Sequence, residues 1–564
     1  MNPAATRDTS TLWRGVRVAL ALIILNGALT FANVWPTLGV HWRGELSVEI
    51  AALVVVLAVG HAHGRQIRRY WLTLLSIVVV LLALGRYADV TSPALYGRPV
   101  NLYWDLPHVG EVFGMLTRVA SWWQLIALAL VTLVVLGALY LLARWSIGQV
   151  DEVMRLHGGV RTGLGVAGAL LVACFLVQQL SNRVPRTPQF SIPVSQTFGV
   201  QVARVVSVVS GSATRGLPPS PQLRSNFMAL HGDDVLLIFV ESYGRSTYDR
   251  PDFLSFLRPS REQLQAAIHD TGRDVVSAFV TSPTFGGQSV LAHLSLLTGI
   301  RVPDTREYRL MMTQHRPTLV SAFRSADYRA VALMPGNQHP WPEGSFYGFD
   351  HIYDAQQMNY QGPQFGWWHI PDQYSLEFLD VKLLQPHPRP PLFVFFPTLS
   401  THMPFRPTPP VQSDWSRMLT PHPYDAAPLQ ASMARTPQWT RLGQSYVGAV
   451  QYFFDTFASF LRRKADEHCV IILLGDHQPA SSVSGEGASW DVPVHIISSR
   501  PAILNSLRAA GFKTGLSPSG PAIGGMNQLT QLLLAAFNDP SANNPARNGA
   551  PHTGALAVLR GVSH

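Results

Sequence analysis

Apolar and polar positions divide the chain into two parts with different patterns. Up to about residue 182, long apolar runs are separated by short charged segments. After about residue 230, the apolar runs are short and alternate with stretches of helical periodicity. Long runs are typical of helices that cross a bilayer, whereas short β-rich runs are typical of buried strands. The pattern therefore predicts an N-terminal membrane unit followed by an α/β unit.

The first part contains five apolar runs that are long enough to cross a bilayer. They cover residues 16–36, 46–62, 70–86, 121–143 and 162–180. The second run is the weakest, because Glu45 and Glu49 flank one end and His61 and His63 flank the other. We predict a transmembrane domain of five helices over residues 1–182. A cleaved signal peptide is the alternative for the first run, but its apolar core is long and no clear small-residue cleavage site follows.

Arginines near the ends of these runs predict the orientation of the chain. They gather before the first run, between the second and third, and between the fourth and fifth. Such clusters are retained on the cytoplasmic side of a membrane. The members are Arg7, Arg14, Arg17, Arg65, Arg68, Arg69, Arg144, Arg155 and Arg161. The N-terminus is therefore expected inside, and five crossings place the chain after residue 182 outside.

The connection between the two parts is rich in Pro, Ser and Arg over residues 183–230, and we expect a linker there. Its valine-rich stretch, residues 200–209, is predicted to lie on the membrane as a short helix. The catalytic domain is expected over residues 231–540. Residues 541–564, rich in Pro, Ala, Asn and Gly, are interpreted as a flexible tail.

Charge and cysteine content narrow the class of protein. The net charge is +9, yet no compact basic run appears, so no nucleic-acid partner is expected. Diffuse positive charge suits a domain that works beside anionic lipid head groups, although a general arginine bias explains it equally well. The two cysteines, Cys174 and Cys469, lie in apolar surroundings and offer no disulfide or metal-thiolate framework.

Short apolar runs in the second part predict six strands separated by helices. The strands are expected at residues 234–240, 275–280, 328–334, 392–397, 469–474 and 493–497, with helices that include residues 316–326 and 441–464. This alternation predicts an α/β domain with a mainly parallel central sheet that is covered on both faces.

Polar residues follow three of these strands directly, where functional groups gather in α/β sheets. Glu241 follows the first strand, Asp476 and His477 follow the fifth, and His402 comes shortly after the fourth. An Asp–His pair with a further carboxylate is a donor set that suits zinc or manganese. The alternative for Glu241 alone is a cap or a surface residue.

A glycine turn leads into a short apolar helix over residues 284–299, and Ser289 stands at the expected helix start. The helix dipole and backbone N–H groups there favour an alkoxide and bind phosphate oxygens. A nearby dication lowers the pKa of the hydroxyl further. Ser289 is thus a candidate nucleophile, and the alternative is a plain N-cap.

Residues 233 to about 500 resemble the alkaline phosphatase and sulfatase superfamily, specifically its membrane branch of lipoteichoic acid synthases and phosphoethanolamine transferases. The run that ends at Glu241 and Ser242 resembles the first metal-ligand strand of that branch, and residues 287–289 resemble its nucleophile turn. Residues 475–479, Gly-Asp-His-Gln-Pro, are similar to its Gly-Asp-His-x-Pro signature. The resemblance implies one divalent metal ion, zinc or manganese, held by Glu241, Ser289, Asp476 and His477.

The resemblance also implies substrate-binding residues. Residues 398–405 resemble the segment whose histidine contacts the substrate phosphate, which gives that role to His402. Residues 347–350 resemble the turn beyond another binding stretch, which places His339 and Trp341 at the pocket. The chain departs from the membrane branch by having Ser instead of Thr at position 289. Leu291 and His293 replace the Pro and Arg of formylglycine-dependent sulfatases, so ordinary sulfatase maturation is not expected.

Three functions are compatible with these features. The leading hypothesis is transfer of a phosphate-linked head group, phosphoethanolamine or phosphoglycerol, from a membrane phospholipid to an envelope glycan or lipid through a Ser289-linked intermediate. The second is a metal-dependent hydrolase of phosphoric or sulfuric esters. The third is an inactive scaffold in envelope biogenesis. The resemblance places the protein in the bacterial inner membrane, as a multi-pass chain with a periplasmic or extracellular catalytic domain.

Overall fold

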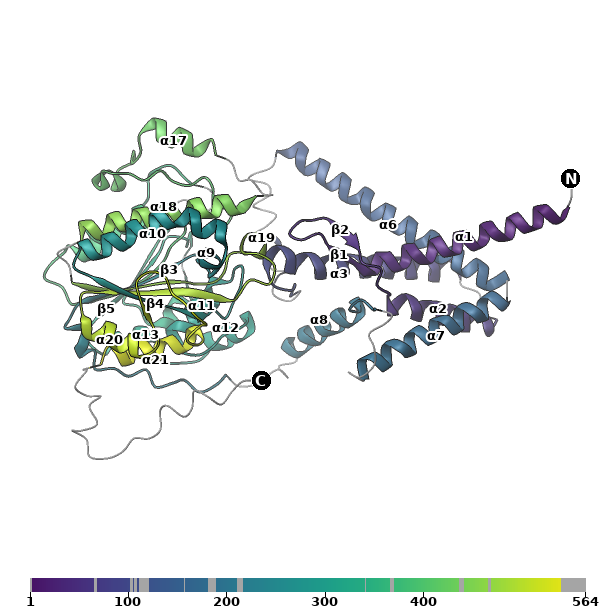
Figure 1. Ribbon diagram of the computed structural model, residues 1–564, viewed down its shortest axis with the longest axis horizontal. Helices are drawn as coiled ribbons and strands as arrows, with labels where there is room; N and C mark the ends of the chain where they lie inside the picture. Colours follow the sequence, from purple (N-terminus) through teal and green to yellow (C-terminus); the bar gives the residue numbers. More distant parts are fainter. Residues whose placement is uncertain are drawn as a thin grey trace, which may run out of the picture. The chain divides into compact units, whose positions relative to one another are not determined.

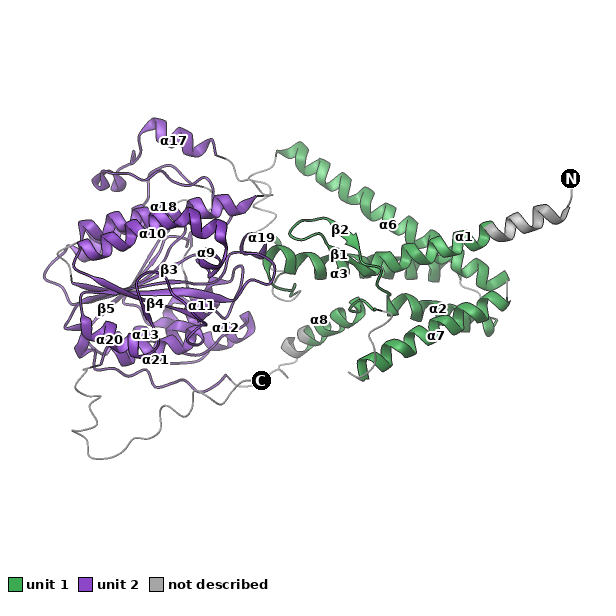
Figure 2. Cartoon of the chain, in the orientation of Figure 1, with its two compact units in different colours: residues 1–215 green, residues 216–564 purple. Residues whose placement is uncertain are grey.

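The chain forms two compact units, residues Met1–Arg215 and Gly216–His564 (Figure 2). The computed structural model describes residues 3–64, 68–101, 105, 109–110, 121–156, 158–180, 189–209, 217–339, 341–365, 370–435, 441–464 and 468–538. Each unit is described by itself. The predicted linker, 183–230, spans the division between them and stays a prediction, as do the other predicted domain boundaries. The predicted tail, 541–564, lies outside the described residues.

The first unit is built from long apolar helices. They are α1 Pro3–Thr30, α2 Val48–Ala62, α3 Arg69–Tyr96, α6 Trp122–Leu156 and α7 Gly158–Leu180. A short antiparallel hairpin of β1 Phe31–Asn33 and β2 Val40–Trp42 joins α1 to α2. Helix α8 Val194–Val209 contains the valine-rich stretch that was predicted to be helical. All five predicted apolar runs are thus largely helical.

Four helices of this unit are long and apolar enough to cross a membrane. They are Trp13–Thr30, Arg69–Tyr96, Trp122–Leu156 and Gly158–Leu180. Helix α2 is apolar but has only 15 residues, and its N-terminus is capped by Ser47. Fifteen residues rise about 22 Å, less than the roughly 30 Å of a bilayer core. Four candidate spans are therefore found in the described part of the chain, and the crossing of α2 stays a prediction.

The second unit is built on one sheet of eight strands in the order β10-β4-β9-β8-β3-β7-β5-β6. The bounds are β3 Asp234–Val240, β4 Asp274–Thr281, β5 Arg329–Met334, β6 His351–Asp354, β7 Leu392–Pro397, β8 Cys469–Gly475, β9 Asp491–Ser498 and β10 Lys513–Thr514. Strands β8, β3, β7, β5 and β6 pair in parallel, and β9 pairs antiparallel with both β8 and β4. The predicted, mainly parallel sheet is confirmed.

Helices cover both faces of this sheet (Figure 1). Helices α10 Pro251–Asp270 and α18 Leu442–Arg463 lie on one face. The other face carries α11 Ser289–Thr298, α13 Leu319–Arg324, α20 Pro501–Ala509 and α21 Met526–Ala536. The remaining α-helices of the described part of this unit are α9 Ser246–Asp249, α12 Thr305–Met312, α14 Gly344–Tyr347, α15 Ala355–Met358, α16 Asp372–Leu379, α17 Ala426–Met433 and α19 Ser481–Ser484.

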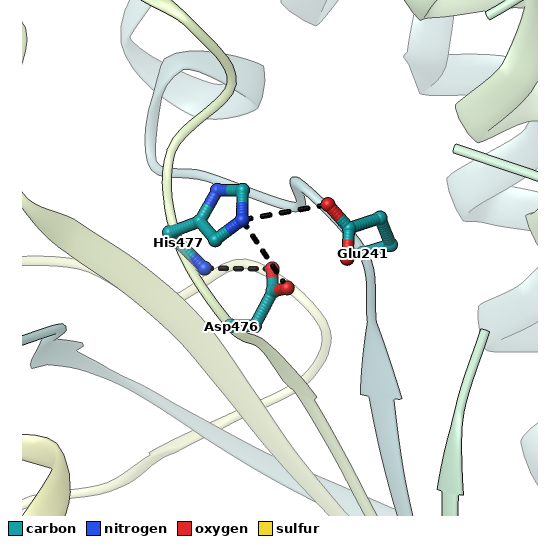
Figure 3. A group of neighbouring side chains, drawn as sticks. All are labelled: Glu241, Asp476 and His477. Carbon is teal, nitrogen blue, oxygen red and sulfur yellow. Dashed lines mark hydrogen bonds and ion pairs between the residues drawn. The ribbon is translucent and has the colours of Figure 1, made fainter. Parts of the chain in front are cut away.

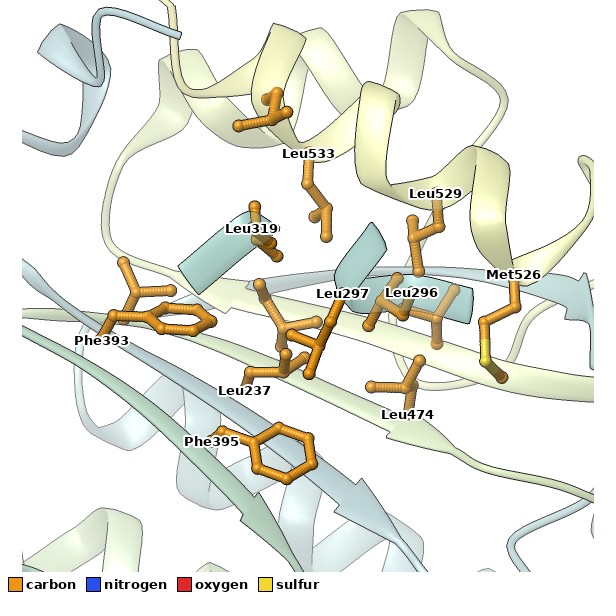
Figure 4. Packing of buried hydrophobic residues seen from close by; sticks show 14 of the residues in the cluster. Leu237, Leu296, Leu297, Leu319, Phe393, Phe395, Leu474, Met526, Leu529 and Leu533 are labelled. Atoms are coloured by element: carbon orange, nitrogen blue, oxygen red, sulfur yellow. The ribbon is translucent and has the colours of Figure 1, made fainter. Parts of the chain in front are cut away.

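Two cores hold the layers together because successive side chains of a strand point to opposite faces. Leu236 and Ile238 of β3 pack with the α10 and α18 side, whereas Leu237 packs with α11 and α21. Figure 4 shows Leu237 close to Leu297 of α11, with α21 beyond. Each fully buried apolar side chain contributes roughly 1.5–3 kcal/mol. The strands, and the loops at their carboxyl ends, are therefore fixed on a rigid layer.

Candidate active site

The register of the two central strands brings distant carboxylates together. β3 and β8 pair in parallel with Val240 opposite Gly475. The next residues along each strand are Glu241 and Asp476, so both leave the sheet at the same edge. Because parallel strands end at one edge, residues 235 positions apart in sequence become neighbours. Two predicted metal ligands are thus placed side by side by strand pairing alone.

A close backbone crossing makes glycine necessary at the end of β8. A Cβ atom on residue 475 would lie 1.8 Å from the carbonyl oxygen of Tyr243. Beside it, Ser242 has a positive φ of 56°, and its carbonyl oxygen accepts a hydrogen bond from the Tyr446 hydroxyl at 2.8 Å. Tyr446 belongs to α18, so the helix layer helps to hold this turn in shape.

Glu241, Asp476 and His477 form a buried group whose potential ligand atoms all lie within 4.8 Å of one another (Figure 3). Nε2 of His477 is 3.4 Å from Oε1 of Glu241 and 3.4 Å from Oδ2 of Asp476. Two carboxylates and an imidazole are hard and intermediate donors that suit zinc or manganese. Among the described residues, this is the group of acidic and histidine side chains that fits a cation.

Hydrogen bonds to the backbone orient the potential ligand atoms of His477 and Asp476 toward the centre of the cluster. Nδ1 of His477 lies 2.8 Å from the carbonyl oxygen of Gln478, so an Nδ1–H donor leaves the Nε2 lone pair facing the carboxylates. Oδ1 of Asp476 accepts from the backbone N–H groups of Ser242 and His477. Oδ2 of Asp476 is buried and has no hydrogen-bond partner in the described part of the chain. A bound dication would satisfy that oxygen.

The hydroxyl of Ser289 points into the same cluster. Ser289 Oγ donates to Oε2 of Glu241 at 2.9 Å and lies 3.2 Å from Nε2 of His477. Ser289 is the first residue of α11, where the helix dipole favours negative charge. The structure therefore brings together all four side chains that the sequence analysis assigned to the metal and nucleophile site.

The turn before Ser289 is fixed by glycine geometry and by one contact with the signature loop. Gly287 has a φ of 142° and Gln288 a φ of 62°. The N–H of Gly286 donates to the carbonyl oxygen of Gln478 at 3.0 Å. Thr284 adds a hydrogen bond from its hydroxyl to the carbonyl oxygen of Gly287 at 2.7 Å. Hydrogen bonds thus fix the turn before Ser289 to the residues after β8.

The charges of the cluster influence one another strongly. Burial raises the pKa of Asp476 to about 8, and the negative charge of Glu241 adds to the effect. Burial alone would lower the pKa of His477, but Asp476 and Glu241 outweigh it and raise that pKa to about 9. Burial favours a higher pKa for Glu241, but the charge and hydrogen bond of His477, together with smaller effects of His402 and Asp476, outweigh burial and lower that pKa. Without a bound cation, these shifts favour protonation of Asp476 and His477.

His402 lies beyond the end of β7, the strand that pairs with β3 on the side opposite β8. The Thr398 hydroxyl accepts a hydrogen bond from the N–H of Glu241 at 3.2 Å, which ties the His402 segment to the cluster. Nδ1 of His402 lies 2.7 Å from the carbonyl oxygen of Met403. Burial lowers the pKa of His402, whereas the nearby Glu241 carboxylate acts in the opposite direction. His402 is thus a half-buried group within electrostatic reach of the site.

His339 and Trp341 lie on a different segment. His339 is exposed, and Trp341 packs against Tyr347 with ring centroids 5.3 Å apart. The structure gives no contact between these two residues and the four-residue cluster within the described ranges. Their role in substrate binding stays a prediction.

Four supporting residues were given no role by the sequence analysis: Ser242, Thr398, Tyr446 and His293. The Ser242 hydroxyl donates to Oε1 of Glu241 at 3.0 Å. His293 is buried one helical turn after Ser289 and packs between Phe239 and Phe395. His293 follows Ser289 by four residues on one helix, and this spacing could have identified it from the sequence. The other contacts join segments far apart in sequence, which no local pattern reveals.

One family model matches part of the second unit. Residues 233–496 match the family model Sulfatase. Enzymes of this family and of the alkaline phosphatase superfamily use divalent metal ions, in keeping with the donor set at Glu241, Asp476 and His477. No curated protein matches the chain.

Solved structures that match part of the chain include three from bacteria. The lipoteichoic acid synthase LtaP from Listeria monocytogenes is 14% identical, over 60% of this chain and 80% of that chain, with a TM-score of 0.35. The phosphoglycerol transferase GacH from Streptococcus pyogenes is 12% identical, over 61% of this chain and 82% of that chain, with a TM-score of 0.36. The C-terminal periplasmic domain of the phosphoethanolamine transferase EptC from Campylobacter jejuni is 11% identical, over 55% of this chain and 95% of that chain, with a TM-score of 0.34. Likeness of this degree does not transfer an activity or a substrate.

Proposed function

From the premise that residues 233–496 are a sulfatase-family domain, we propose that the protein transfers a phosphate-linked head group from a membrane phospholipid to an acceptor in the cell envelope. The head group is phosphoethanolamine or phosphoglycerol, and the acceptor is a glycan or a lipid. Ser289 carries the group between the two half-reactions. The enzyme is a multi-pass protein of the bacterial inner membrane with its catalytic unit outside.

The observation that supports this proposal is the position of one hydroxyl. Ser289 Oγ lies 2.9 Å from Glu241 Oε2 and 3.2 Å from His477 Nε2, at the first residue of a helix. A serine at a helix N-terminus beside buried ligand-type side chains is suited to attack a phosphorus atom. A plain N-cap, the alternative considered from the sequence, has its oxygen bonded to a backbone N–H two or three residues later. Here the helix is preceded by Gln288, and the Ser289 oxygen faces the cluster.

The reaction proceeds in two displacements at phosphorus. In the first, the oxygen of Ser289 forms a bond to the phosphorus of the lipid, and the bond to the diacylglycerol oxygen breaks. The hydroxyl proton passes to Glu241, to which it already donates, and a proton reaches the departing diacylglycerol oxygen from the site or from water. In the second, a hydroxyl of the acceptor forms a bond to the same phosphorus as its proton passes to the site or to water, the bond from phosphorus to Ser289 Oγ breaks, and Glu241 returns the proton to Ser289.

A divalent cation, zinc or manganese, would be held by Glu241, Ser289, Asp476 and His477. When bound, it supplies positive charge that lowers the pKa of the serine hydroxyl and offsets negative charge on the phosphate oxygens. Backbone N–H groups hold Oδ1 of Asp476, and the Gln478 carbonyl oxygen orients His477, so the donor atoms keep their positions through both steps. His402, beyond β7, is placed to contact a phosphate oxygen in both transition states.

Removal of one hydroxyl tests this proposal. Ser289→Ala should reduce transfer of labelled head group from phospholipid vesicles by several orders of magnitude, because no other atom takes its place. Ser289→Thr should retain measurable transfer, since it keeps a hydroxyl on the same carbon. Unchanged thermal unfolding of both variants is the control for folding. Retained turnover by Ser289→Ala refutes the role, and release of the group to water alone indicates a hydrolase instead of a transferase.

A further inference from the structure

The first unit contains an apolar groove that the proposed chemistry does not use. It lies between α1, α2 and α7 and has a cavity volume of about 360 Å³. Its walls include Leu22 of α1, Ile50 and Val54 of α2, and Leu164 and Leu171 of α7. All of these helices belong to the unit with the candidate membrane spans. The groove is therefore an apolar slot on helices that would be surrounded by lipid.

A polar pocket of about 800 Å³ lies at one end of this groove. The two are continuous along the chain: Leu171 lines the groove and Phe175, one turn later on α7, lines the pocket. Leu46 lines the groove, and its neighbour Glu45 lines the pocket. Helices α1 and α7 end here and α2 begins here, so the predicted orientation places the pocket at the outer surface of the membrane. Groove and pocket together are called the α1–α2–α7 cleft.

The rim of the cleft is held by specific hydrogen bonds. Leu46 N–H donates to the carbonyl oxygen of Gln189 at 2.9 Å, and Ser191 N–H donates to the carbonyl oxygen of Leu46 at 3.0 Å. The amide of Asn26 donates to the carbonyl oxygen of Glu45 at 2.8 Å and accepts from the N–H of Ser47 at 2.9 Å. Three segments distant in sequence are thus fastened together around the pocket.

Two side chains in the pocket, those of Ser191 and Arg43, are suited to bind a ligand with several oxygen atoms. The hydroxyl of Ser191 is buried, with only 3% of the residue exposed, and has no hydrogen-bond partner in the described part of the chain. Arg43 also lines the pocket, and it forms no ion pair with any described residue. Arginine is the side chain best suited to bind a phosphodiester. A buried hydroxyl without a partner costs free energy that a bound oxygen would recover.

We propose that the α1–α2–α7 cleft binds one phospholipid of the bilayer, with an acyl chain in the groove and the phosphodiester at Arg43 and Ser191. The dimensions fit: Leu164 to Leu171 covers about 10 Å of helix rise, most of the roughly 15 Å of one leaflet. The further claim that this lipid is the donor of the head group rests on the proposed transfer function. Lipid binding itself requires only that the unit lies in a membrane.

Photolabelling tests this site without any need for turnover. The full chain with Ser289→Ala is placed in vesicles that contain phosphatidylethanolamine with a photoreactive acyl chain, and labelled peptides are mapped by mass spectrometry. Labels should fall on α2 and α7. Arg43→Gln should lower this labelling about tenfold, since one charge-assisted hydrogen bond is worth about that factor. Ala167→Phe, which fills the groove from an exposed wall position, should also lower it strongly, and Ser191→Ala by a smaller factor.

Matched control variants distinguish specific lipid binding in the cleft from general contact of the helices with lipid. Ala169→Phe adds the same side chain to an exposed position of α7 outside the groove lining, and Arg17→Gln removes the same charge from α1. Both should label like the parent chain. The proposal is overturned if the controls lose label as the test variants do, or if a photoreactive diacylglycerol without phosphate labels the cleft equally well. If labelling behaves as expected while the unmutated chain transfers nothing, the lipid site stands and the proposed function fails.

Discussion

Two buried carboxylates dominate the electrostatics of the candidate active site. Glu241 and Asp476 are both buried beside His477, and Oδ2 of Asp476 lacks a hydrogen-bond partner among the described residues. Burial of like charges is unfavourable unless a positive charge lies between them. The protein without a cation meets this need by protonation, whereas a dication would replace the proton and stabilise the folded state.

A thermal shift measurement tests this interpretation. Addition of zinc or manganese to chelator-treated protein should raise Tm, because a ligand at 100 times its Kd stabilises the folded state by about 2.7 kcal/mol. Asp476→Asn should lose most of the shift, since it removes the charge that draws the cation. Asp274→Asn, an exposed carboxylate at the start of β4, should shift like the unmutated protein. Equal shifts in the two variants would place the cation elsewhere.

His495 on β9 is a second buried histidine, but it lies in a network of hydroxyl groups instead of carboxylates. Nδ1 lies 2.6 Å from the Ser277 hydroxyl, and Nε2 lies 3.1 Å from the Tyr243 hydroxyl. Burial lowers the pKa of His495 to about 3. The folded protein therefore holds this ring neutral, whereas the unfolded chain takes up a proton at the ordinary value of 6.5.

The stability of the second unit should accordingly fall as the pH is lowered from about 6.5 toward 3. The unfolded state binds the proton first in that window, at a cost of at most about 1.4 kcal/mol per pH unit for one group. His495→Gln should flatten this dependence while losing about 1–3 kcal/mol at neutral pH through imperfect hydrogen bonds. Chemical unfolding at a series of pH values measures both effects. An unchanged slope in His495→Gln, or a slope equally flattened in the exposed His422→Gln, contradicts the assignment.

Sequence motifs located the four cluster residues because each follows an apolar strand or a glycine turn that is visible in the chain. The same reasoning did not find Thr398, Tyr446 or His495 as supporting groups. Their hydrogen bonds to Glu241, Ser242 and Ser277 cross more than 150 positions of sequence. Such partnerships depend on which strands and helices become neighbours, and a single sequence carries no local record of them.

At the scale of elements, the pairing of β3 with β8 positions the site. Their parallel register sets Glu241 beside Asp476, and the close crossing at Gly475 allows the Tyr243 backbone to pass. The turn before α11 is fastened to the residues after β8 through Gly286 and Gln478. Three elements are thus fixed to one another over a few residues, so a small change at the crossing should disturb the whole site.

A pair of glycine substitutions tests that dependence. Gly475→Ala places a Cβ atom 1.8 Å from the Tyr243 carbonyl oxygen, so the strand end must move. We expect a loss of several kcal/mol of stability together with loss of the cation-induced Tm shift. Gly448→Ala in α18 meets no atom within 4 Å and should raise stability by about 0.5–1 kcal/mol. Denaturant unfolding separates the two, and a neutral Gly475→Ala would show that the crossing is not strained.

All six predicted strands are confirmed. They could be predicted because each is a short, continuous apolar run that ends in polar residues. Strands β6 and β10 were not predicted. β6, His-Ile-Tyr-Asp, has no apolar run, and β10 has two exposed residues that join the sheet edge only by backbone pairing. The antiparallel direction of β9 was also not predicted. Burial on both faces gives its sequence the same appearance as a parallel strand.

At the scale of the whole molecule, the proposed location of the second unit outside the membrane depends on the number of helices that cross. Four helices are long enough to cross, and α2 is shorter but apolar. An odd number of crossings places the two ends of the membrane unit on opposite sides, as the arginine pattern predicts. The apolar character of α2 could be predicted from the sequence. Its length of 15 residues could not, because it depends on the cap at Ser47 and on the end of the helix at Ala62.

One measurement addresses the central claim most directly, namely that Ser289 carries the head group. The full-length protein is incubated with native membranes, quenched rapidly, and the peptide that contains Ser289 is weighed and sequenced by mass spectrometry. A phosphate-linked head group should be attached to Ser289, its mass should identify the group, and Asp476→Asn should show none. Turnover without any adduct on Ser289, or an adduct on a different residue, would contradict the account.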